Sequence, residues 1–230
     1  MDEHMTLQAS QLAYARGNRK LFADLGFEIK AGEALHVAGR NGSGKTSLLR
    51  VLCGLAQPIR GSVSWQGRPI ARQRDYFHHS LTYIGHGVGL KDDLTAWENV
   101  QIGALLAGRA CTRTQAHDAL AQFGLSERVH LPARVLSQGQ RRRVVLARLA
   151  LHAGADSQGR LLVLDEPFVA LDQESVSLLA DVLMRQLARG ATLVYTTHQP
   201  LALKASAMHE LVLGGAHADK HAASPTTEAV

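Results

Sequence analysis

Hydrophobic and polar positions alternate near the start of the chain, and short apolar runs appear later. Phe27 and Ile29 alternate with Glu28 and Lys30, which is typical of a strand with one buried face. The run at 161–164 contains no polar residue, so it indicates a central parallel strand buried on both faces. The pattern predicts short strands within 5–29 with a turn at 16–19, and further strands at 35–38, 62–65, 81–84, 161–164, 192–196 and 210–213.

Helices are expected between these strands. Thr95 followed by Glu98 matches a capping box, and the helix that it starts should reach about residue 106. Other helices are expected at 47–54, at about 114–123 and 139–152, and at 173–188. A helical subdomain over about 91–152 is therefore inserted into a chain of strands, and the predicted fold class is α/β. The polar, patternless tail from 214 to 230 is predicted to be disordered, which leaves 1–213 as the folded domain.

One loop carries the strongest chemical signal. It reads Gly39-Arg40-Asn41-Gly42-Ser43-Gly44-Lys45-Thr46 and is followed by Ser47. The loop fits the phosphate-binding motif G-x-x-x-x-G-K-[ST], and it lies between a predicted strand and a predicted helix, as the motif requires. Its glycines let several N–H groups face one phosphate chain, and the helix start adds its positive dipole end. Lys45 would reach the β- and γ-phosphates, and the Thr46 hydroxyl would ligate Mg²⁺. The alternative is an ordinary glycine turn that happens to precede a lysine.

Two carboxylates follow the apolar run at 161–164. A phosphate-binding loop needs a carboxylate for the Mg²⁺ shell, normally at the end of a neighbouring parallel strand, and Asp165 fits this position. Glu166 is the candidate general base, because adjacent residues at a strand end point in different directions. The alternative is a pair of acidic turn residues before Pro167.

A second candidate anion site opens the helix expected at about 139–152. It lies in the segment Leu136-Ser137-Gln138-Gly139-Gln140. A serine and a glycine backbone at a helix start can bind an anion through N–H groups. Ser137, Gly139 and Gln140 are therefore further candidate binding residues.

Together these motifs resemble the ATP-binding cassette (ABC) ATPases. The signature of that family is L-S-G-G-Q, and this chain has Gln138 in place of the first glycine. Asp165-Glu166-Pro167, Ala170-Leu171-Asp172 and His198 follow in the family's order. The resemblance covers nearly the whole chain up to about residue 213. It implies a P-loop NTPase fold of the ABC nucleotide-binding type, with a parallel core sheet, an N-terminal antiparallel β subdomain and an inserted helical subdomain.

The resemblance also implies that two copies pack head to tail. The loop at 39–46 of one copy and the segment at 137–140 of the other close over the same ATP, with Mg²⁺ as the cofactor. Glu166 then polarises the attacking water, His198 contacts the γ-phosphate, and Asp172 lies across the dimer seam. The alternative for His198 is a satisfied core histidine at a strand end.

Two positions depart from the family pattern. The loop after residue 84 usually carries a glutamine, whereas this chain has His86, a side-chain type that, unlike glutamine, can take up a proton. It could still bridge a metal-bound water or sense the transport partner. The family also tends to stack an N-terminal aromatic ring on adenine. Tyr14 is the nearest aromatic residue, but the best local match is Arg16, which could cover a purine face by a cation–π contact.

Within the ABC family, the chain most resembles the haem-exporter ATP-binding subunit of bacterial cytochrome c maturation (the CcmA family). The similar segments are Val63-Ser64-Trp65-Gln66-Gly67, Tyr83-Ile84-Gly85-His86, Gly89-Leu90-Lys91, Leu94-Thr95-Ala96-Trp97-Glu98-Asn99 and Thr196-Thr197-His198-Gln199-Pro200. His86 is ordinary in that subfamily, whereas Gly87-Val88 and Gln138 replace its usual Gln-Pro and alanine. The resemblance implies a peripheral subunit on the cytoplasmic face of the bacterial inner membrane, with a multi-span permease and other cytochrome c maturation subunits as partners. ATP hydrolysis would drive haem export or the release of a haem chaperone.

Composition narrows the alternatives. The formal charge is +5, and its one concentration is the arginine run at 141–143. We expect no nucleic-acid partner, because DNA- and ribosome-associated cassettes usually carry a coiled-coil insertion or a second P-loop. Cys53 and Cys111 form no C-x-x-C pattern, which favours a reducing compartment and a core position for Cys53. Neither a signal peptide nor an apolar stretch of about 20 residues is apparent.

Direct haem binding is not expected. The tempting ligands are His78, His79 and His86, but no C-x-x-C-H motif accompanies them, so haem would be handled by the membrane partners. An ABC ATPase that serves another small cargo is the main alternative. A scaffold that binds ATP without turnover conflicts with the presence of Glu166.

Overall fold

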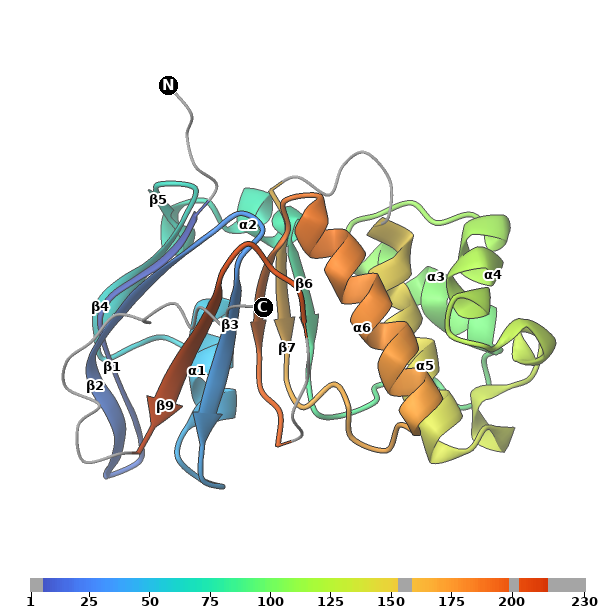
Figure 1. The fold of residues 1–230 in the computed structure, drawn as a ribbon, viewed down its shortest axis with the longest axis horizontal. Helices are drawn as coiled ribbons and strands as arrows, with labels where there is room; N and C mark the ends of the chain where they lie inside the picture. The colour runs from blue at the N-terminus through green and yellow to red at the C-terminus, as the bar shows by residue number, and fades with distance from the viewer. Residues whose placement is uncertain (1–5, 153–158, 199–202, 215–230) are drawn as a thin grey trace, which may run out of the picture.

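The computed structural model describes residues 6–152, 159–198 and 203–214. Its strands form two sheets, with most of the helices beyond the second sheet (Figure 1). The first sheet has the order β2-β1-β4-β5, and all its neighbouring strands are antiparallel. Its strands are β1 (Thr6–Arg16), β2 (Arg19–Lys30), β4 (Arg60–Trp65) and β5 (Arg68–Pro69). The antiparallel N-terminal subdomain is thus confirmed, and its first two strands are longer than the short strands predicted.

The second sheet is parallel throughout, with the order β6-β7-β8-β3-β9. Its strands are β3 (Ala34–Gly39), β6 (Leu81–Ile84), β7 (Leu161–Leu164), β8 (Thr192–Tyr195) and β9 (Met208–Leu213). Side chains of β7 alternate between two hydrophobic cores, as the pleat of a strand requires. Leu161 and Val163 face the core shared with the antiparallel sheet, and Leu162 and Leu164 face the core shared with the helices. The prediction of a strand buried on both faces is confirmed.

The helices are α1 (Lys45–Leu52), α2 (Arg74–Ser80), α3 (Ala96–Leu106), α4 (Arg113–Ala121), α5 (Gln138–Leu146) and α6 (Gln173–Ala188). Three of them, α3, α4 and α5, follow β6 and precede β7 in the chain, which confirms that helices are inserted between two strands of the parallel sheet. Both α3 and α4 lie at the end of the molecule opposite the antiparallel sheet (Figure 1). The capping box is also confirmed, since Thr95 N donates to Glu98 Oε2 at 2.8 Å.

Two helical segments differ from the prediction. α2 has no counterpart among the predicted helices, because Phe77 is its only buried residue and one apolar position gives no helical period. The helix expected over 139–152 is α-helical only to Leu146, and a 3₁₀ helix continues over Ala147–His152. The predicted disordered tail falls almost wholly outside the described residues.

Cys53 lies in the core, as expected, with no exposed surface. Burial raises the pKa of its thiol well above the ordinary value, because a thiolate is poorly solvated among apolar groups. Both cysteines are free. Within the described ranges, no helix is both long enough and apolar enough to cross a membrane.

Candidate active site

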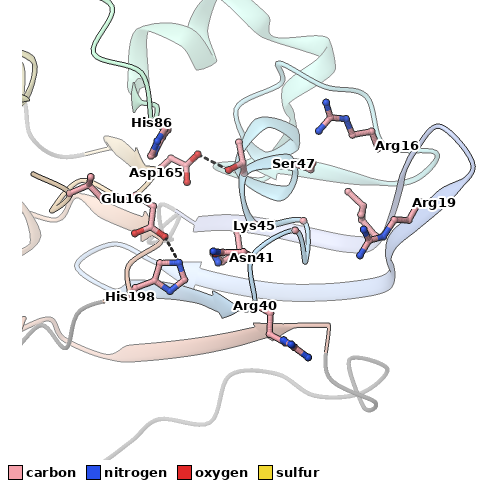
Figure 2. Close-up of a pocket in the computed structure, with 15 residues that line it drawn as sticks. Arg16, Arg19, Arg40, Asn41, Lys45, Ser47, His86, Asp165, Glu166 and His198 are labelled. Carbon is pink, nitrogen blue, oxygen red and sulfur yellow. Dashed lines mark hydrogen bonds and ion pairs between the residues drawn. The ribbon is translucent and has the colours of Figure 1, made fainter.

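An open cleft of about 600 Å³ lies at the carboxyl ends of the parallel strands (Figure 2). Most of the loop at 40–47 lines it, together with His86, Asp165, Glu166 and His198. These segments are far apart in the chain, but each follows a parallel strand. Because the carboxyl ends of such strands meet at one edge of the sheet, they are the usual location of ligand sites in α/β folds.

The loop between β3 and α1 has the backbone that a phosphate cradle needs. Gly44 is the N-cap of α1 with φ +106°, and Gly39 has φ +139°. A Cβ atom on Gly39 would lie 2.5 Å from the Leu213 carbonyl oxygen, so the close approach of the two backbones excludes any side chain there. Ser43 contributes a buried Oγ atom for which the described structure provides no hydrogen-bond partner. Ser43 is not among the residues that line the cleft, and its side chain lies next to Gly39.

Lys45 lies across the same loop. Its side chain is 9% exposed, and its Nζ donates to the Gly39 carbonyl oxygen at 2.7 Å. The cleft also contains three arginines, Arg16, Arg19 and Arg40. These cations outnumber the two carboxylates, so the cleft suits a polyanion.

Asp165 is held between two hydroxyl groups. It is 2% exposed; Oδ2 accepts from Thr46 Oγ1 at 2.8 Å, and Oδ1 accepts from Thr196 Oγ1 at 2.9 Å. Thr46 and Asp165, which were each predicted to help hold Mg²⁺, are therefore in direct contact. A carboxylate and a hydroxyl oxygen are hard donors of the kind that Mg²⁺ takes alongside substrate phosphates and water.

Glu166 and His198 face each other at the edge of the cleft, with His198 Nε2 at 3.3 Å from Glu166 Oε1 (Figure 2). The side chain of Glu166 is 14% exposed, whereas that of His198 is 57% exposed, which argues against a core histidine. Glu166 has φ +50°, a conformation that is rare for a residue with a side chain and is found at functional sites. Its backbone N–H donates to Thr196 Oγ1 at 2.8 Å, which helps to hold this conformation.

His86 follows β6 and lines the cleft beside Asp165 (Figure 2). Arg16 also lines the cleft. Tyr14 is not among the lining residues, and its ring stacks on Phe22 at a centroid distance of 5.9 Å. Arg19, at the start of β2, is a lining residue that the sequence analysis missed. Its only signal was its place in the predicted turn at 16–19.

The other predicted binding residues lie outside the lining of this cleft. Ser137 is the N-cap of α5, and it forms a capping box with Gln140. Asp172 is the N-cap of α6 and accepts from Ser175 N at 2.8 Å. Hydrogen bonds from the Ser175 side chain, and then from its backbone, lower the pKa of the Asp172 carboxyl group. A Cβ atom on Gly139 would lie 2.9 Å from the Ala170 carbonyl oxygen, so the start of α5 and the segment before Asp172 are neighbours.

The arginine run at 141–143 is not a basic surface patch. Arg141 pairs with Asp92 at 2.6 Å, and Arg143 donates to the Phe123 carbonyl oxygen at 3.2 Å. Arg142 is 3% exposed and donates to backbone oxygens beside the cleft. Each arginine thus has an internal structural contact.

Comparisons with known proteins agree with this geometry. The family model described as ABC transporter matches residues 22–169. The cytochrome c biogenesis ATP-binding export protein CcmA of Nitrosomonas europaea is 48% identical over 207 residues, which cover 90% of this chain and 95% of that protein. The protein of the same name from Pseudomonas aeruginosa is 48% identical over 200 residues, covering 87% of this chain and 96% of that protein.

A solved structure shares the fold at lower identity. It is an ATP-binding cassette described as a dimer in a post-hydrolysis state bound to ADP and Pi. Its TM-score is 0.74 and its identity 21%, over 91% of this chain and 97% of that chain. From the family model, the relatives and the fold, we conclude that the chain belongs to the ABC transporter family and, within it, to the CcmA group of ATP-binding proteins.

Proposed function

We propose that this chain is the ATP-hydrolysing subunit of an ABC complex of cytochrome c biogenesis. ATP hydrolysis would drive haem export, or the release of a haem chaperone, for the maturation of c-type cytochromes. The observation that carries the ATPase part is the convergence of Lys45, Thr46, Asp165, Glu166 and His198 around one cleft. The cytochrome part rests on the names of relatives that are 48% identical over most of the chain.

Each residue has a proposed role. The N–H groups at 39–46 and the Lys45 ammonium bind the phosphates of ATP. Thr46 and Asp165 would hold Mg²⁺, which would supply positive charge to offset that of the ATP phosphates. Glu166 orients and deprotonates the attacking water. This role is supported by the Oε1 atom of Glu166, a buried acceptor that has no partner in the described structure besides His198. His198 donates to the γ-phosphate, and Arg16 or Tyr14 covers the adenine.

The complete ATP site requires a second copy of the chain. Ser137, Gly139 and Gln140 have the helix-start geometry of an anion site but do not line the cleft of their own chain. In a head-to-tail dimer, these residues of one copy close over the nucleotide that the other copy holds. Asp172 then lies at the seam, because its segment packs beside Gly139.

A separate groove is the proposed surface for a multi-span membrane partner. It has a volume of about 370 Å³ and is lined by Leu55, Leu106, Lys91, Arg109 and Arg148, among others. Leu106 is 83% exposed and Leu55 is 50% exposed. A group of exposed apolar side chains is typical of an interaction surface. We place the chain on the cytoplasmic face of the inner membrane through this contact.

A complementation experiment tests the proposal. Wild-type chain and Glu166→Gln would be expressed in a strain that lacks its own cytochrome c biogenesis ATP-binding protein, and haem covalently attached to c-type cytochromes would be stained after denaturing electrophoresis. We expect the wild type to restore the stain and Glu166→Gln to accumulate without restoring it.

Two results would contradict the proposal in different ways. Normal c-type cytochromes after clean deletion of this chain from its own host would remove the haem role and leave an ATPase for another small cargo. A purified wild-type chain that binds ATP but never hydrolyses it, with or without its membrane partner, would remove the ATPase role.

A further inference from the structure

Arg142 is a buried cation in the first turns of α5. It is 3% exposed, and its hydrogen bonds run to five backbone carbonyl oxygens. Burying a charged group is costly unless it is hydrogen-bonded. A buried cation is therefore found only where several acceptors surround it. The segments that supply these carbonyl oxygens are the segments that Arg142 joins.

The five carbonyl oxygens belong to two segments of the cleft. Nη1 of Arg142 donates to Gly85 O at 3.1 Å and to His86 O at 3.4 Å. Nη2 donates to Glu166 O at 2.8 Å and to Asp165 O at 3.3 Å, and Nε donates to Pro167 O at 3.4 Å. One planar guanidinium group therefore joins the loop after β6 to the chain that leaves β7. It also ties both segments to α5, the helix that begins at the segment 137–140.

The charge of Arg142 is balanced by the site itself. Burial lowers the pKa of its guanidinium group, and the negative charges of Asp165 and then Glu166 oppose that effect. Within the described ranges, no carboxylate forms a salt bridge with Arg142. The two carboxylates of the cleft are thus its electrostatic counterparts, and its planar fork of donors is a geometry that lysine cannot copy.

Glu166 depends on Arg142 for its backbone conformation. A residue with φ +50° costs free energy unless its surroundings fix it. On one side, Glu166 N donates to Thr196 Oγ1, and on the other side Glu166 O accepts from Arg142. With the second contact removed, the backbone can relax, and the carboxylate no longer points at a fixed place in the cleft.

The loop after β6 extends from the cleft to the groove. His86 lines the cleft, while Val88, Gly89, Leu90 and Lys91 line the groove that we assign to the membrane partner. A shift of this loop would therefore pull on the Gly85 and His86 carbonyl oxygens that Arg142 holds.

We propose that Arg142 is a positioning residue that fixes the Glu166 carboxylate and couples its placement to the start of α5 and to the loop at 85–91. The proposal rests on the proposed role of Glu166 as general base. Arg142 is not among the residues that line the cleft; it acts through the backbone of Glu166 and the loop. Its loss should therefore lower the rate of hydrolysis without weakening nucleotide binding.

Three variants at two adjacent positions of α5 test the role of Arg142. They are Arg142→Gln, Arg142→Lys and the control Arg141→Gln. Arg141 pairs with the exposed Asp92 and with the Ala133 carbonyl oxygen, and it does not line the cleft. We expect Arg142→Gln to lower kcat about ten-fold or more, with the Kd for ATP in EDTA unchanged within about two-fold. Arg142→Lys keeps the charge but only part of the fork, so its kcat should fall in between. The control should keep the wild-type kcat.

Amide hydrogen exchange supplies a second measurement. Residues 85–87 should exchange faster in Arg142→Gln than in Arg141→Gln, because Arg142 holds the Gly85 and His86 carbonyl oxygens, whereas Arg141 contacts the chain at Asp92, beyond the other end of the loop. If Arg142→Gln fails to fold, Arg142→Lys carries the test, since it keeps the buried charge. Wild-type kcat in a folded Arg142 variant, or equal loss in the Arg141 control, overturns the inference. An inactive wild-type chain would instead overturn the proposed ATPase function, so the two failures are distinguishable.

Discussion

Two helix starts in this molecule have the chemistry of anion sites, but only one is surrounded by reactive groups. The start of α1 lies in the cleft with Asp165, Glu166 and His198. The start of α5 has a complete capping box and lies outside the lining of that cleft. N–H groups at a helix start can bind a phosphate, but they cannot supply a base or a metal ligand. In the proposed head-to-tail dimer, the start of α1 is an equipped half-site and the start of α5 a bare half-site, and each chain would supply one of each to the two shared sites.

The bare half-site nonetheless has a defined local structure. Its helix is capped by Ser137, and its backbone at Gly139 packs closely against Ala170. Ala170 has φ +64°, a conformation that is uncommon for a residue with a side chain. Two exposed segments therefore lie in contact with each other next to Asp172.

The largest effect should come from the equipped half-site. In Glu166→Gln the amide cannot accept the proton of the attacking water, so ATP turnover should fall about 10²- to 10⁴-fold. Lys45 and the loop at 39–46 are untouched, and ATP binding should persist. Steady-state phosphate release and equilibrium ATP binding would measure the two properties separately. Turnover near the wild-type level would remove Glu166 as the base and make the two half-sites less different than we argue.

A smaller effect should come from substitutions of Ser137 in the bare half-site. The test variant and its control there differ from each other only in charge. Asp and Asn are both good N-caps, so Ser137→Asp and Ser137→Asn should both keep α5 folded. Ser137→Asp places a carboxylate against the partner's phosphates and should lower kcat about ten- to a hundred-fold. Ser137→Asn should stay within a few-fold of the wild type.

Mixing variants shows whether the half-sites come from different copies. Lys45→Ala and Ser137→Asp should each be nearly inactive alone. Combined in equal amounts, they should recover up to about a quarter of wild-type turnover, because half of the dimers are mixed and each holds one site with both halves intact. No recovery, in a mixture shown to exchange subunits, would mean that both defects act within one chain.

The same contrast explains how much could be predicted from the sequence. The residues of the equipped half-site were predictable because they lie in short contiguous motifs at the ends of predicted strands. Arg142 was not, because three consecutive arginines look like a solvated surface until the packing of α5 shows which one points inward. α2 was missed because a helix that buries only Phe77 leaves no periodic signal.

The choice between Tyr14 and Arg16 stayed open in the sequence for a different reason. β1 shifts register against β2 between Leu12 and Tyr14, and again between Tyr14 and Ala15. A bulge changes which face the following side chains occupy, so period-two alternation cannot assign these residues to a face. The structure turns the Tyr14 ring onto Phe22 and leaves Arg16 at the cleft.

The smallest effect should therefore come from the adenine edge of the equipped half-site. Arg16→Ala should weaken ATP binding about two- to five-fold, the size of an exposed cation–π contact. It should leave tripolyphosphate binding unchanged, because a stacking residue acts on the base and not on the phosphates. Tyr14→Leu should keep the Kd for ATP and lower the unfolding temperature instead, since it loses the contact with Phe22. Both Kd values can be measured by calorimetry in EDTA. If tripolyphosphate weakens in parallel with ATP, Arg16 acts as one more cation of the cleft, and if only Tyr14→Leu weakens ATP, the aromatic residue covers the adenine.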